Sequence, residues 1–268
     1  MPLNHERHGS GEPLILLHGV GGELCVWEPV IEPLSNGLEV IAADLPGFGH
    51  SAPLPAHLSP TPQALARIVA ELMDELGLES AHLAGNSLGA WVALELAKGP
   101  RARSVTALCP AGLWGAPLRA AGPPARGRTH AFARSARWLL PLLTMSRRVR
   151  RLALTHVVAH PDRVPRRAAR RMISSYARAT AYEATRAAML TSAFEQPDRI
   201  RVPLTVGFGE FDRLIRPVRL SVPGARTVLL PDCGHIPMWD DPELVTNLIA
   251  DTVGAGSTRR GQRSLRVP

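Results

Sequence analysis

The stretch HLAGNSLGAWVAL, His82 to Leu94, decides the fold. At its centre is Ser87, with Gly85 two residues before it and Gly89 two residues after it. The pattern G-x-S-x-G is short, and the chain contains 23 glycines. These five residues alone therefore do not distinguish a nucleophilic serine from a serine in a glycine-rich turn.

The residues around Ser87 predict a strand, a sharp turn and a helix. Residues 80–85 form an apolar run typical of a buried strand, and residues 88–98 are typical of a mostly buried helix. A sharp strand-to-helix turn strains its central residue and crowds the positions two before and two after it, where glycine fits. The turn would also lift the hydroxyl to a helix N-terminus, where the dipole and free N–H groups favour negative charge.

Short apolar runs recur along the chain, with helical patterns between them. Runs that are apolar on both faces are typical of parallel strands covered by helices on both sides. One helical pattern begins with Thr61 as N-cap and Pro62 at the first helical position, and ends at Gly77. The alternation predicts an α/β fold with a doubly wound, mostly parallel sheet. The predicted strands lie within residues 13–19, 38–49, 80–85, 104–112, 202–209 and 226–232.

The alternation stops between residues 113 and 196. No strand-like run occurs there, and prolines divide short, arginine-rich helical pieces. We therefore predict a core in two parts, residues 1–112 and 197–254, interrupted by a helical insertion at 113–196. The tail, residues 255–268, has almost nothing to bury, so we expect it to be disordered.

Two loops downstream of Ser87 supply a base and an acid. A serine hydroxyl is a weak nucleophile unless a base removes its proton, and the base needs a partner that holds its ring. His235 follows the last predicted strand and precedes an amphipathic helix, and it is the expected base. Asp212 follows the preceding strand and is the expected acid. Glu210 and Asp232 are alternatives, in positions typical of turn or strand-exit residues.

Two backbone N–H groups are candidates to bind an oxyanion. The first belongs to Leu88, which follows the predicted nucleophile. The second is expected from Val20, in the loop LHGVGG of residues 17–22, where three glycines allow the backbone to approach a substrate closely.

Five motifs resemble the α/β-hydrolase superfamily, specifically its lid-bearing serine esterase-like branch, which is similar to carboxylesterases and to the carbon–carbon hydrolases of meta-cleavage products. The order nucleophile, acid, histidine is the order of this fold. The resemblance implies that Ser87, Asp212 and His235 are a catalytic triad and that residues 113–196 are a lid over the active site. Because only a dozen residues precede LILLHG, we expect the family's first strand to be absent. The motifs are LHGVGG (17–22), DLPGFGHS (44–51), GNSLGA (85–90), GEFDRLIRP (209–217) and CGHIPMWDDPE (233–243).

The resemblance implies hydrolysis of a carboxylic ester or thioester, with a small or acyl-chain substrate, through an acyl-enzyme on Ser87. An alternative is carbon–carbon bond hydrolysis, because GNSLG resembles that subgroup, although Ile236 follows the histidine where the subgroup usually has tryptophan. Cofactor-free perhydrolases share the triad. A non-enzymatic scaffold is disfavoured because no triad member is missing. A serine nucleophile argues against haloalkane dehalogenases and epoxide hydrolases, which use aspartate there.

Large apolar side chains are candidates to line an acyl pocket. We expect Trp114 and Trp138 of the insertion, and Trp239 near the histidine, to contact the substrate. The alternative for the insertion residues is a small core of the insertion itself. Further candidates of the insertion are Phe132, Met145, Met172 and Tyr176.

We expect neither a cofactor nor a metal. Residues 47–52, GFGHSA, fit a dinucleotide-binding pattern, but Pro53 and Pro55 follow where that pattern requires a helix. Three widely spaced cysteines, at 25, 109 and 233, indicate reduced thiols rather than disulfides or a zinc site. No apolar run reaches the roughly 18 residues of a membrane span, and the first residues lack a signal core. A cytoplasmic protein is therefore expected.

Positive charge is concentrated in one part of the chain. Residues 101–178 contain 17 arginines, no lysine and one acid, Asp162, so this segment carries +16 within a total of +8. One explanation is GC-rich coding, since Lys98 is the only lysine. The other is that the arginine-rich lid meets an acidic carrier protein or an anionic surface. No interleaved stacking aromatics accompany the arginines, so nucleic acid is not expected. The oligomeric state is left open.

Overall fold

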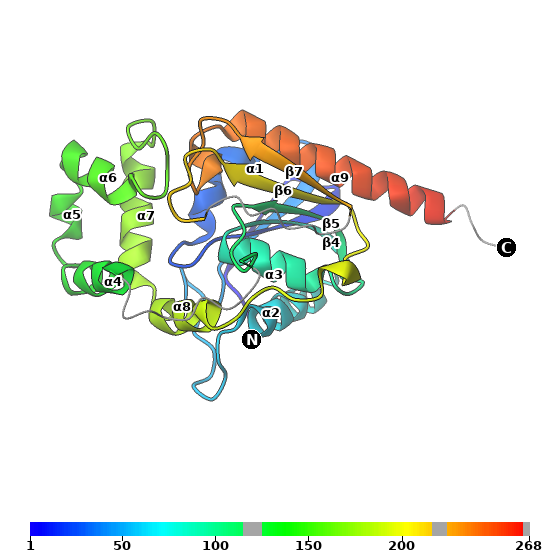
Figure 1. Ribbon diagram of the computed structural model, residues 1–268, viewed down its shortest axis with the longest axis horizontal. Helices are drawn as coiled ribbons and strands as arrows, with labels where there is room; N and C mark the ends of the chain where they lie inside the picture. Colours follow the sequence, from blue (N-terminus) through cyan, green and yellow to red (C-terminus); the bar gives the residue numbers. More distant parts are fainter. Residues whose placement is uncertain (115–124, 216–223, 265–268) are drawn as a thin grey trace.

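The computed structural model describes residues 1–114, 125–215 and 224–264 (Figure 1). They contain a seven-stranded sheet in the order β1-β3-β2-β4-β5-β6-β7. β1 is antiparallel to β3, and every other neighbouring pair is parallel, so the predicted mostly parallel α/β sheet is confirmed. The strands are β1 His5–His8, β2 Glu12–Leu17, β3 Leu38–Ala43, β4 Ala81–Asn86, β5 Ala102–Leu108, β6 Leu204–Gly209 and β7 Ala225–Leu230.

Helices cover both faces of the sheet, with α1 and α9 on one face and α2 and α3 on the other (Figure 1). Successive side chains of a strand point to opposite faces. In β2, Leu14 and Leu16 therefore pack toward α1 and α9, whereas Ile15 and Leu17 pack toward α2 and α3. The helices of this core are α1 Glu28–Ser35, α2 Pro62–Glu75, α3 Leu88–Leu96 and α9 Pro242–Ser264, with the 3-10 turns η1 Leu24–Trp27, η2 Pro197–Arg199 and η3 Pro237–Trp239.

The strand β1 is not among the predicted strands, which begin at residue 13. β1 spans only His5–His8, in the charged sequence HERH, and it pairs antiparallel with β3 at the edge of the sheet. Arg7 of β1 forms an ion pair with Glu39 of β3. A short edge strand needs no apolar run, and charged side chains on it discourage pairing with other chains.

The tail expected to be disordered from residue 255 onward is helical as far as the structure describes it. α9 continues to Ser264, and residues 265–268 lie outside the described part of the chain. The Ser257 hydroxyl donates to the carboxylate of Glu12 at the start of β2, and Gly256 lies against the start of β5. Each residue added to an existing helix loses conformational freedom but gains one backbone hydrogen bond. The end of α9 can therefore be ordered without burying much apolar surface of its own.

The described residues between β5 and β6 contain five α-helices, all within the stretch predicted as an insertion (Figure 1). Its two ends are joined, because the Phe194 N–H donates to the Gly112 carbonyl (2.9 Å) and the Trp114 indole N–H donates to the Ser192 carbonyl (2.9 Å). Residues 115–124 of the predicted insertion lie outside the described chain. None of the helices in the described residues is long and apolar enough to cross a membrane. The helices are α4 Ala125–Ser135, α5 Leu140–Leu143, α6 Arg147–Leu154, α7 Arg166–Arg178 and α8 Tyr182–Leu190.

Candidate active site

Ser87 lies in a strained turn between β4 and α3. Its φ is 55° and its ψ is −111°, a backbone conformation that residues other than glycine rarely adopt. A Cβ added to Gly85 would lie 2.3 Å from the carbonyl oxygen of Gly89, and one added to Gly89 would lie 2.1 Å from that of Leu17. Only glycine fits at these two positions, which is the geometry that the sequence predicts.

The loop after β2 passes directly against Ser87. A Cβ added to Gly19 would lie 3.1 Å from the Cβ of Ser87. The Gly22 N–H donates to the Gly19 carbonyl (3.0 Å) and closes a turn around Val20. Leu88 begins α3, where the first N–H groups of a helix have no acceptor within the helix. Both predicted oxyanion donors therefore lie close to the serine. Leu88 is the next residue after Ser87, and Val20 is the next residue after Gly19, which packs against Ser87.

His235 and Asp212 form a buried hydrogen-bonded pair, with 2.8 Å between Nδ1 of the histidine and Oδ2 of the aspartate. The other carboxylate oxygen accepts the N–H groups of Leu214 (2.7 Å) and Ile215 (2.9 Å). Burial acts to raise the pKa of Asp212, but His235 and these backbone donors outweigh it, so the pKa lies below its usual value. An ionised Asp212 favours a proton on Nδ1, which leaves Nε2 as the atom that can accept a proton.

The two rival acids have other partners. Glu210 accepts the backbone N–H of Asp232 (3.0 Å), and the carboxylate of Asp232 lies 2.8 Å from Nε2 of His160. Among the residues that the structure describes, Asp212 is the acid that pairs with His235.

Asn86 connects the turn of Ser87 to the loop of His235. Its side-chain amide donates to the carbonyl of His235 (2.8 Å) and to that of Leu108 (3.3 Å), and the residue is buried. In the sequence, Asn86 only hinted at one subgroup of hydrolases. The contact spans 149 residues of chain, so no local pattern could have indicated it.

Cys109 lies beside the Asp212–His235 pair. Its Sγ and one ligand atom of each partner all lie within 4.8 Å of one another, and the thiol donates to the carbonyl of Gly234 (3.7 Å). Burial, followed by the charge of Asp212, raises the pKa of the Cys109 thiol well above its ordinary value. A protonated thiol is a poor nucleophile. Cys109 therefore acts as a weak donor next to the acid, a role the sequence could not indicate without the strand order.

The loop of His235 is fastened to the insertion by Asp240. The Asp240 carboxylate accepts the N–H groups of Gly234 (2.8 Å), Ala159 (3.0 Å) and His160 (2.9 Å). Ile236, next to the histidine, donates its N–H to the carbonyl of Val157 (2.7 Å). The Asp240 carboxylate thus joins the histidine loop to insertion residues 159 and 160, and sequence analysis did not identify this contact.

Replacement of Asp240 with alanine is expected to lower kcat about 10-fold to 100-fold, because three N–H groups lose their acceptor and the His235 loop loses its connection to the insertion. KM is expected to change less than kcat, since Asp240 acts through the position of the histidine. Steady-state kinetics and a thermal melt measure the two effects. The matched control is Asp241→Ala: the Asp241 carboxylate accepts the Leu244 N–H (2.9 Å) and caps α9. Its loss should lower stability by about 1 kcal/mol and leave kcat unchanged. Equal kcat losses in both variants would contradict a positioning role for Asp240.

The three predicted substrate-contacting tryptophans have different surroundings. Trp114 is half-buried, packs edge-to-face on Trp91 with 5.5 Å between ring centroids, and joins the ends of the insertion. Trp239 is half-buried in η3 and packs against the small core of the insertion around Met172. Trp138 is 75% exposed between α4 and α5. Such exposure does not fit the wall of an acyl pocket, so the prediction for Trp138 is corrected.

An aromatic cluster of the insertion lies against the loop around Val20. A Cβ added to Gly21 would lie 2.7 Å from the ring of Tyr176 and 3.2 Å from that of Tyr182. The two tyrosine rings pack edge-to-face at 5.0 Å, and the ring of His130 stacks on Tyr182 at 4.2 Å. Tyr176 is a predicted candidate. Tyr182 and His130 were missed because only the fold brings α4, α7 and α8 together.

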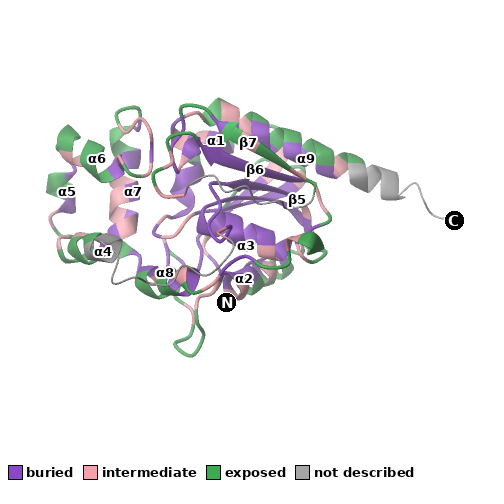
Figure 2. Cartoon of the chain, in the orientation of Figure 1, coloured by how far each residue is buried: buried purple, intermediate pink, exposed green. Residues whose placement is uncertain are grey.

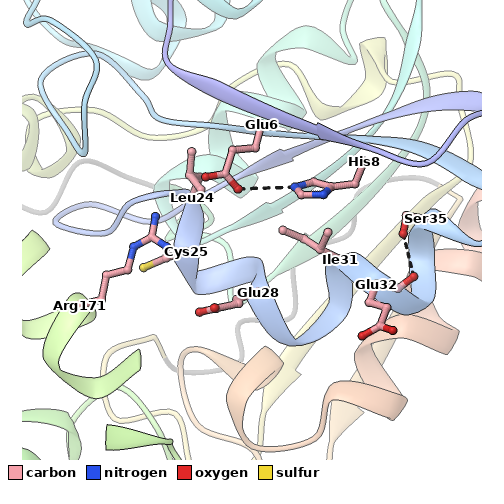
Figure 3. A pocket seen from close by; sticks show the side chains of 9 residues that line it. All are labelled: Glu6, His8, Leu24, Cys25, Glu28, Ile31, Glu32, Ser35 and Arg171. Carbon is pink, nitrogen blue, oxygen red and sulfur yellow. Dashed lines mark hydrogen bonds and ion pairs between the residues drawn. The ribbon is translucent and has the colours of Figure 1, made fainter. Parts of the chain in front are cut away.

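A pocket of about 370 Å³ lies away from Ser87, between β1, α1 and α7 (Figure 3). Next to it, the buried carboxylate of Glu23 pairs with Arg171 (2.5 Å) and Arg178 (3.6 Å) of α7. Burial raises the pKa of the Cys25 thiol at its edge, so that thiol is not a reactive nucleophile. We interpret this region as a structural junction between core and insertion. The pocket is lined by Glu6, His8, Leu24, Cys25, Glu28, Ile31, Glu32, Ser35 and Arg171.

Comparisons with known proteins identify the family of the chain. Residues 14–248 match the model of the alpha/beta hydrolase family. The chain therefore belongs to the alpha/beta hydrolase family, whose fold it shares.

Two curated relatives and one solved structure indicate the range of similar proteins. The chain is 34% identical over 206 residues to the epoxide hydrolase EphH of Mycobacterium tuberculosis, covering 70% of this chain and 93% of that protein. It is 40% identical over 97 residues, 36% of each chain, to the pimeloyl-[acyl-carrier protein] methyl ester esterase of Aeromonas hydrophila. A thermophilic esterase from Thermogutta terrifontis has the same fold, with a TM-score of 0.72 and 24% identity over 95% of this chain and 93% of that one.

Proposed function

We propose that this protein is a serine hydrolase that cleaves a carboxylic ester or thioester of a small or acyl-chain substrate through an acyl-enzyme on Ser87. The observation that carries the proposal is the buried pair of His235 and Asp212, 2.8 Å apart, in a loop that Asn86 ties to the strained turn of Ser87. A strained serine, a histidine with a free ring nitrogen and an ionised acid are the parts that nucleophilic acyl transfer requires.

In the proposed cycle, Nε2 of His235 takes the proton of Ser87 as the serine oxygen attacks the carbonyl carbon. The negative oxygen of the tetrahedral intermediate is bound by the N–H groups of Leu88 and Val20, each of which typically lowers such a barrier by about 3 kcal/mol. His235 then gives its proton to the leaving group, and the acyl group remains on Ser87. Water, activated by the same histidine, releases the acid. The cycle uses no cofactor.

Epoxide hydrolysis, the activity named for one relative, is chemically unsuited to Ser87. A carboxylate that opens an epoxide forms an ester, and water can cleave that ester at its carbonyl carbon. A serine that opens an epoxide forms an ether, which has no carbonyl for water to attack. We therefore favour acyl transfer, even though the epoxide hydrolase is 34% identical to this chain.

Carbon–carbon hydrolysis and perhydrolysis are the alternatives within serine chemistry. The carbon–carbon interpretation relies on an arginine of the insertion to bind the substrate's carboxylate. Arg171 and Arg178 of α7 are both paired with the buried Glu23, which argues against their use for this purpose.

We further propose that the insertion acts as a lid. Ser87 and His235 are only 5% and 6% exposed, and Tyr176 and Tyr182 of the insertion lie against the loop that holds Val20. Movement of α7 and α8 away from that loop would open a path for substrate to Ser87.

The proposal is tested with p-nitrophenyl esters from acetate to laurate, a matched acyl thioester, a vinylogous 1,5-diketone, a chromogenic epoxide, and acetate with hydrogen peroxide. Hydrolysis of at least one ester or thioester is expected, together with covalent labelling by a fluorophosphonate. The acyl-chain length of the ester that is hydrolysed fastest would indicate the depth of the acyl pocket. Faster cleavage of the diketone than of every ester would favour the carbon–carbon alternative, and absence of labelling would contradict serine catalysis.

A further inference from the structure

Exposed apolar side chains are concentrated on one part of the insertion. Of the nine large apolar side chains that are exposed in the described chain, six lie between residues 132 and 152, on α4, α5, α6 and their connections. Trp138, Leu152 and Phe132 are the most exposed, at 75%, 73% and 72%. Figure 2 shows exposed residues over most of α5 and α6. We call residues 132–152 the α4–α6 surface. Its exposed apolar side chains are Phe132, Trp138, Leu142, Leu143, Met145 and Leu152.

Arginines alternate with these apolar residues along the same segment. Only one acid, Asp162, lies anywhere between residues 101 and 178, and it contacts Arg147 (3.0 Å) and Arg151 (3.7 Å). The α4–α6 surface is therefore both apolar and strongly positive. Its exposed arginines are Arg134, Arg137, Arg147, Arg148 and Arg151.

This combination favours one kind of partner. Arginines alone would suit any acidic molecule, but six exposed apolar side chains, tryptophan and phenylalanine among them, need an apolar environment as well. A second copy of the surface would bring the same positive charge against itself. An anionic bilayer offers headgroups to the arginines and an acyl boundary to the apolar side chains, which is how amphipathic basic segments bind in the plane of a membrane interface.

We propose that the α4–α6 surface binds the surface of a bilayer that contains anionic lipid. Trp138, Leu142 and Leu152 enter the region between headgroups and acyl chains, and the arginines contact the phosphates. The surface lies on the side of α7 that faces away from the sheet (Figure 1). Binding therefore leaves the sheet and the active site outside the bilayer.

Vesicle sedimentation tests the proposal with the full chain carrying Ser87→Ala, which minimises serine-dependent hydrolysis of lipid during the measurement. Vesicles are made of phosphatidylcholine alone or of equal parts of phosphatidylcholine and phosphatidylglycerol. We expect binding to the anionic vesicles that is at least about tenfold tighter than to the neutral ones and that weakens as salt is raised.

Paired variants separate the apolar and the charged contributions. Trp138→Ala with Leu142→Ala is expected to weaken binding about tenfold or more. The control, Leu58→Ala with Leu229→Ala, removes exposed apolar residues elsewhere and should not change binding. Loss of two interfacial arginines is expected to weaken binding about thirtyfold. Arg134→Gln with Arg137→Gln makes this change, and Arg67→Gln with Arg226→Gln is its control of equal net charge.

Quenching by brominated lipid reports whether Trp138 enters the bilayer. Trp27 and Trp91 are fully buried, and Trp114 and Trp239 are half-buried, so the quenched fluorescence should come from Trp138. Trp138→Phe is expected to remove the quenching while the protein still sediments with the vesicles.

Three results would overturn the proposal. The first is no sedimentation with either vesicle. The second is binding to an acidic acyl-carrier protein in place of vesicles, which would identify a protein partner. The third is a stable dimer in light scattering that the Trp138→Ala and Leu142→Ala pair dissociates. Hydrolysis of a soluble ester is measured separately on the wild type, so failure of the lipid proposal is distinguishable from failure of the proposed function.

Discussion

Replacing Ser87 with alanine is expected to lower kcat for ester hydrolysis by a factor of about 10⁴ to 10⁶ and to abolish labelling by a fluorophosphonate. In the proposed cycle, the variant lacks the oxygen that would form the acyl-enzyme, while the N–H groups of Leu88 and Val20 would still bind a carbonyl oxygen. Some catalysis over water therefore remains, and binding of a substrate analogue is expected to change little. Hydrolysis rates and mass spectrometry of the labelled protein measure these effects.

A second serine–histidine pair in the same fold provides the control. The Ser104 hydroxyl lies 2.8 Å from Nδ1 of His82, and Nε2 of His82 lies 3.6 Å from a carboxylate oxygen of Glu12. This group is at the opposite end of the strands from Ser87, and both Ser104 and His82 are fully buried. Ser104→Ala is expected to keep kcat within about twofold of the wild type. Labelling that persists in Ser87→Ala but not in Ser104→Ala would show that the nucleophile is misassigned.

The core of the fold could be predicted because its residues carry local signals. At Gly85 and Gly89, a Cβ atom would lie 2.3 Å or less from backbone oxygen atoms, so only glycine fits at these positions. The sequence shows this requirement as the pattern G-x-S-x-G. β1 could not be predicted in the same way, since HERH gains its order only from pairing with β3. The last turns of α9 are similar, because their order comes from contacts with the starts of β2 and β5.

The candidate site likewise contains some features that local sequence signals predict and others that depend on contacts between distant segments. The strained turn of Ser87 and the pairing of Asp212 with His235 could be predicted because the residue type, the neighbouring strand and the chain order all point to one arrangement. Asp240 and Tyr182 could not, since each acts through contacts with segments distant in the chain. The expectation that Trp138 contacts the substrate was wrong because the residue type alone does not show whether a side chain faces the core or the solvent. Trp138 faces the solvent.

Replacing Asp212 with asparagine is expected to lower kcat by about 10⁴-fold, with little change in the fold. The neutral amide can present its NH₂ group to His235, which then carries its proton on Nε2 and cannot accept the proton of Ser87. The pKa of Asp212 lies below its usual value, so the wild-type carboxylate is ionised through the mildly acidic range. The variant's loss of kcat should therefore be similar from mildly acidic to neutral pH. Activity measured across that range, with ester substrate at saturation, tests the expectation.

The melting temperature of Asp212→Asn provides a second test, because the direction of its change with pH can be predicted. A carboxylate whose pKa is lowered by folding stabilises the protein above the pKa of the unfolded chain, and this contribution is lost as the pH falls through the folded pKa. Asp212→Asn should therefore melt below the wild type at neutral pH, and the difference should shrink in acid. The matched control is Glu210→Gln, which changes the rival acid, engaged with the Asp232 N–H. Its kcat is expected to stay within a few-fold of the wild type. A larger loss in Glu210→Gln than in Asp212→Asn would reverse the assignment of the acid, because only the residue that holds the ring of His235 controls the tautomer on which proton transfer from Ser87 depends.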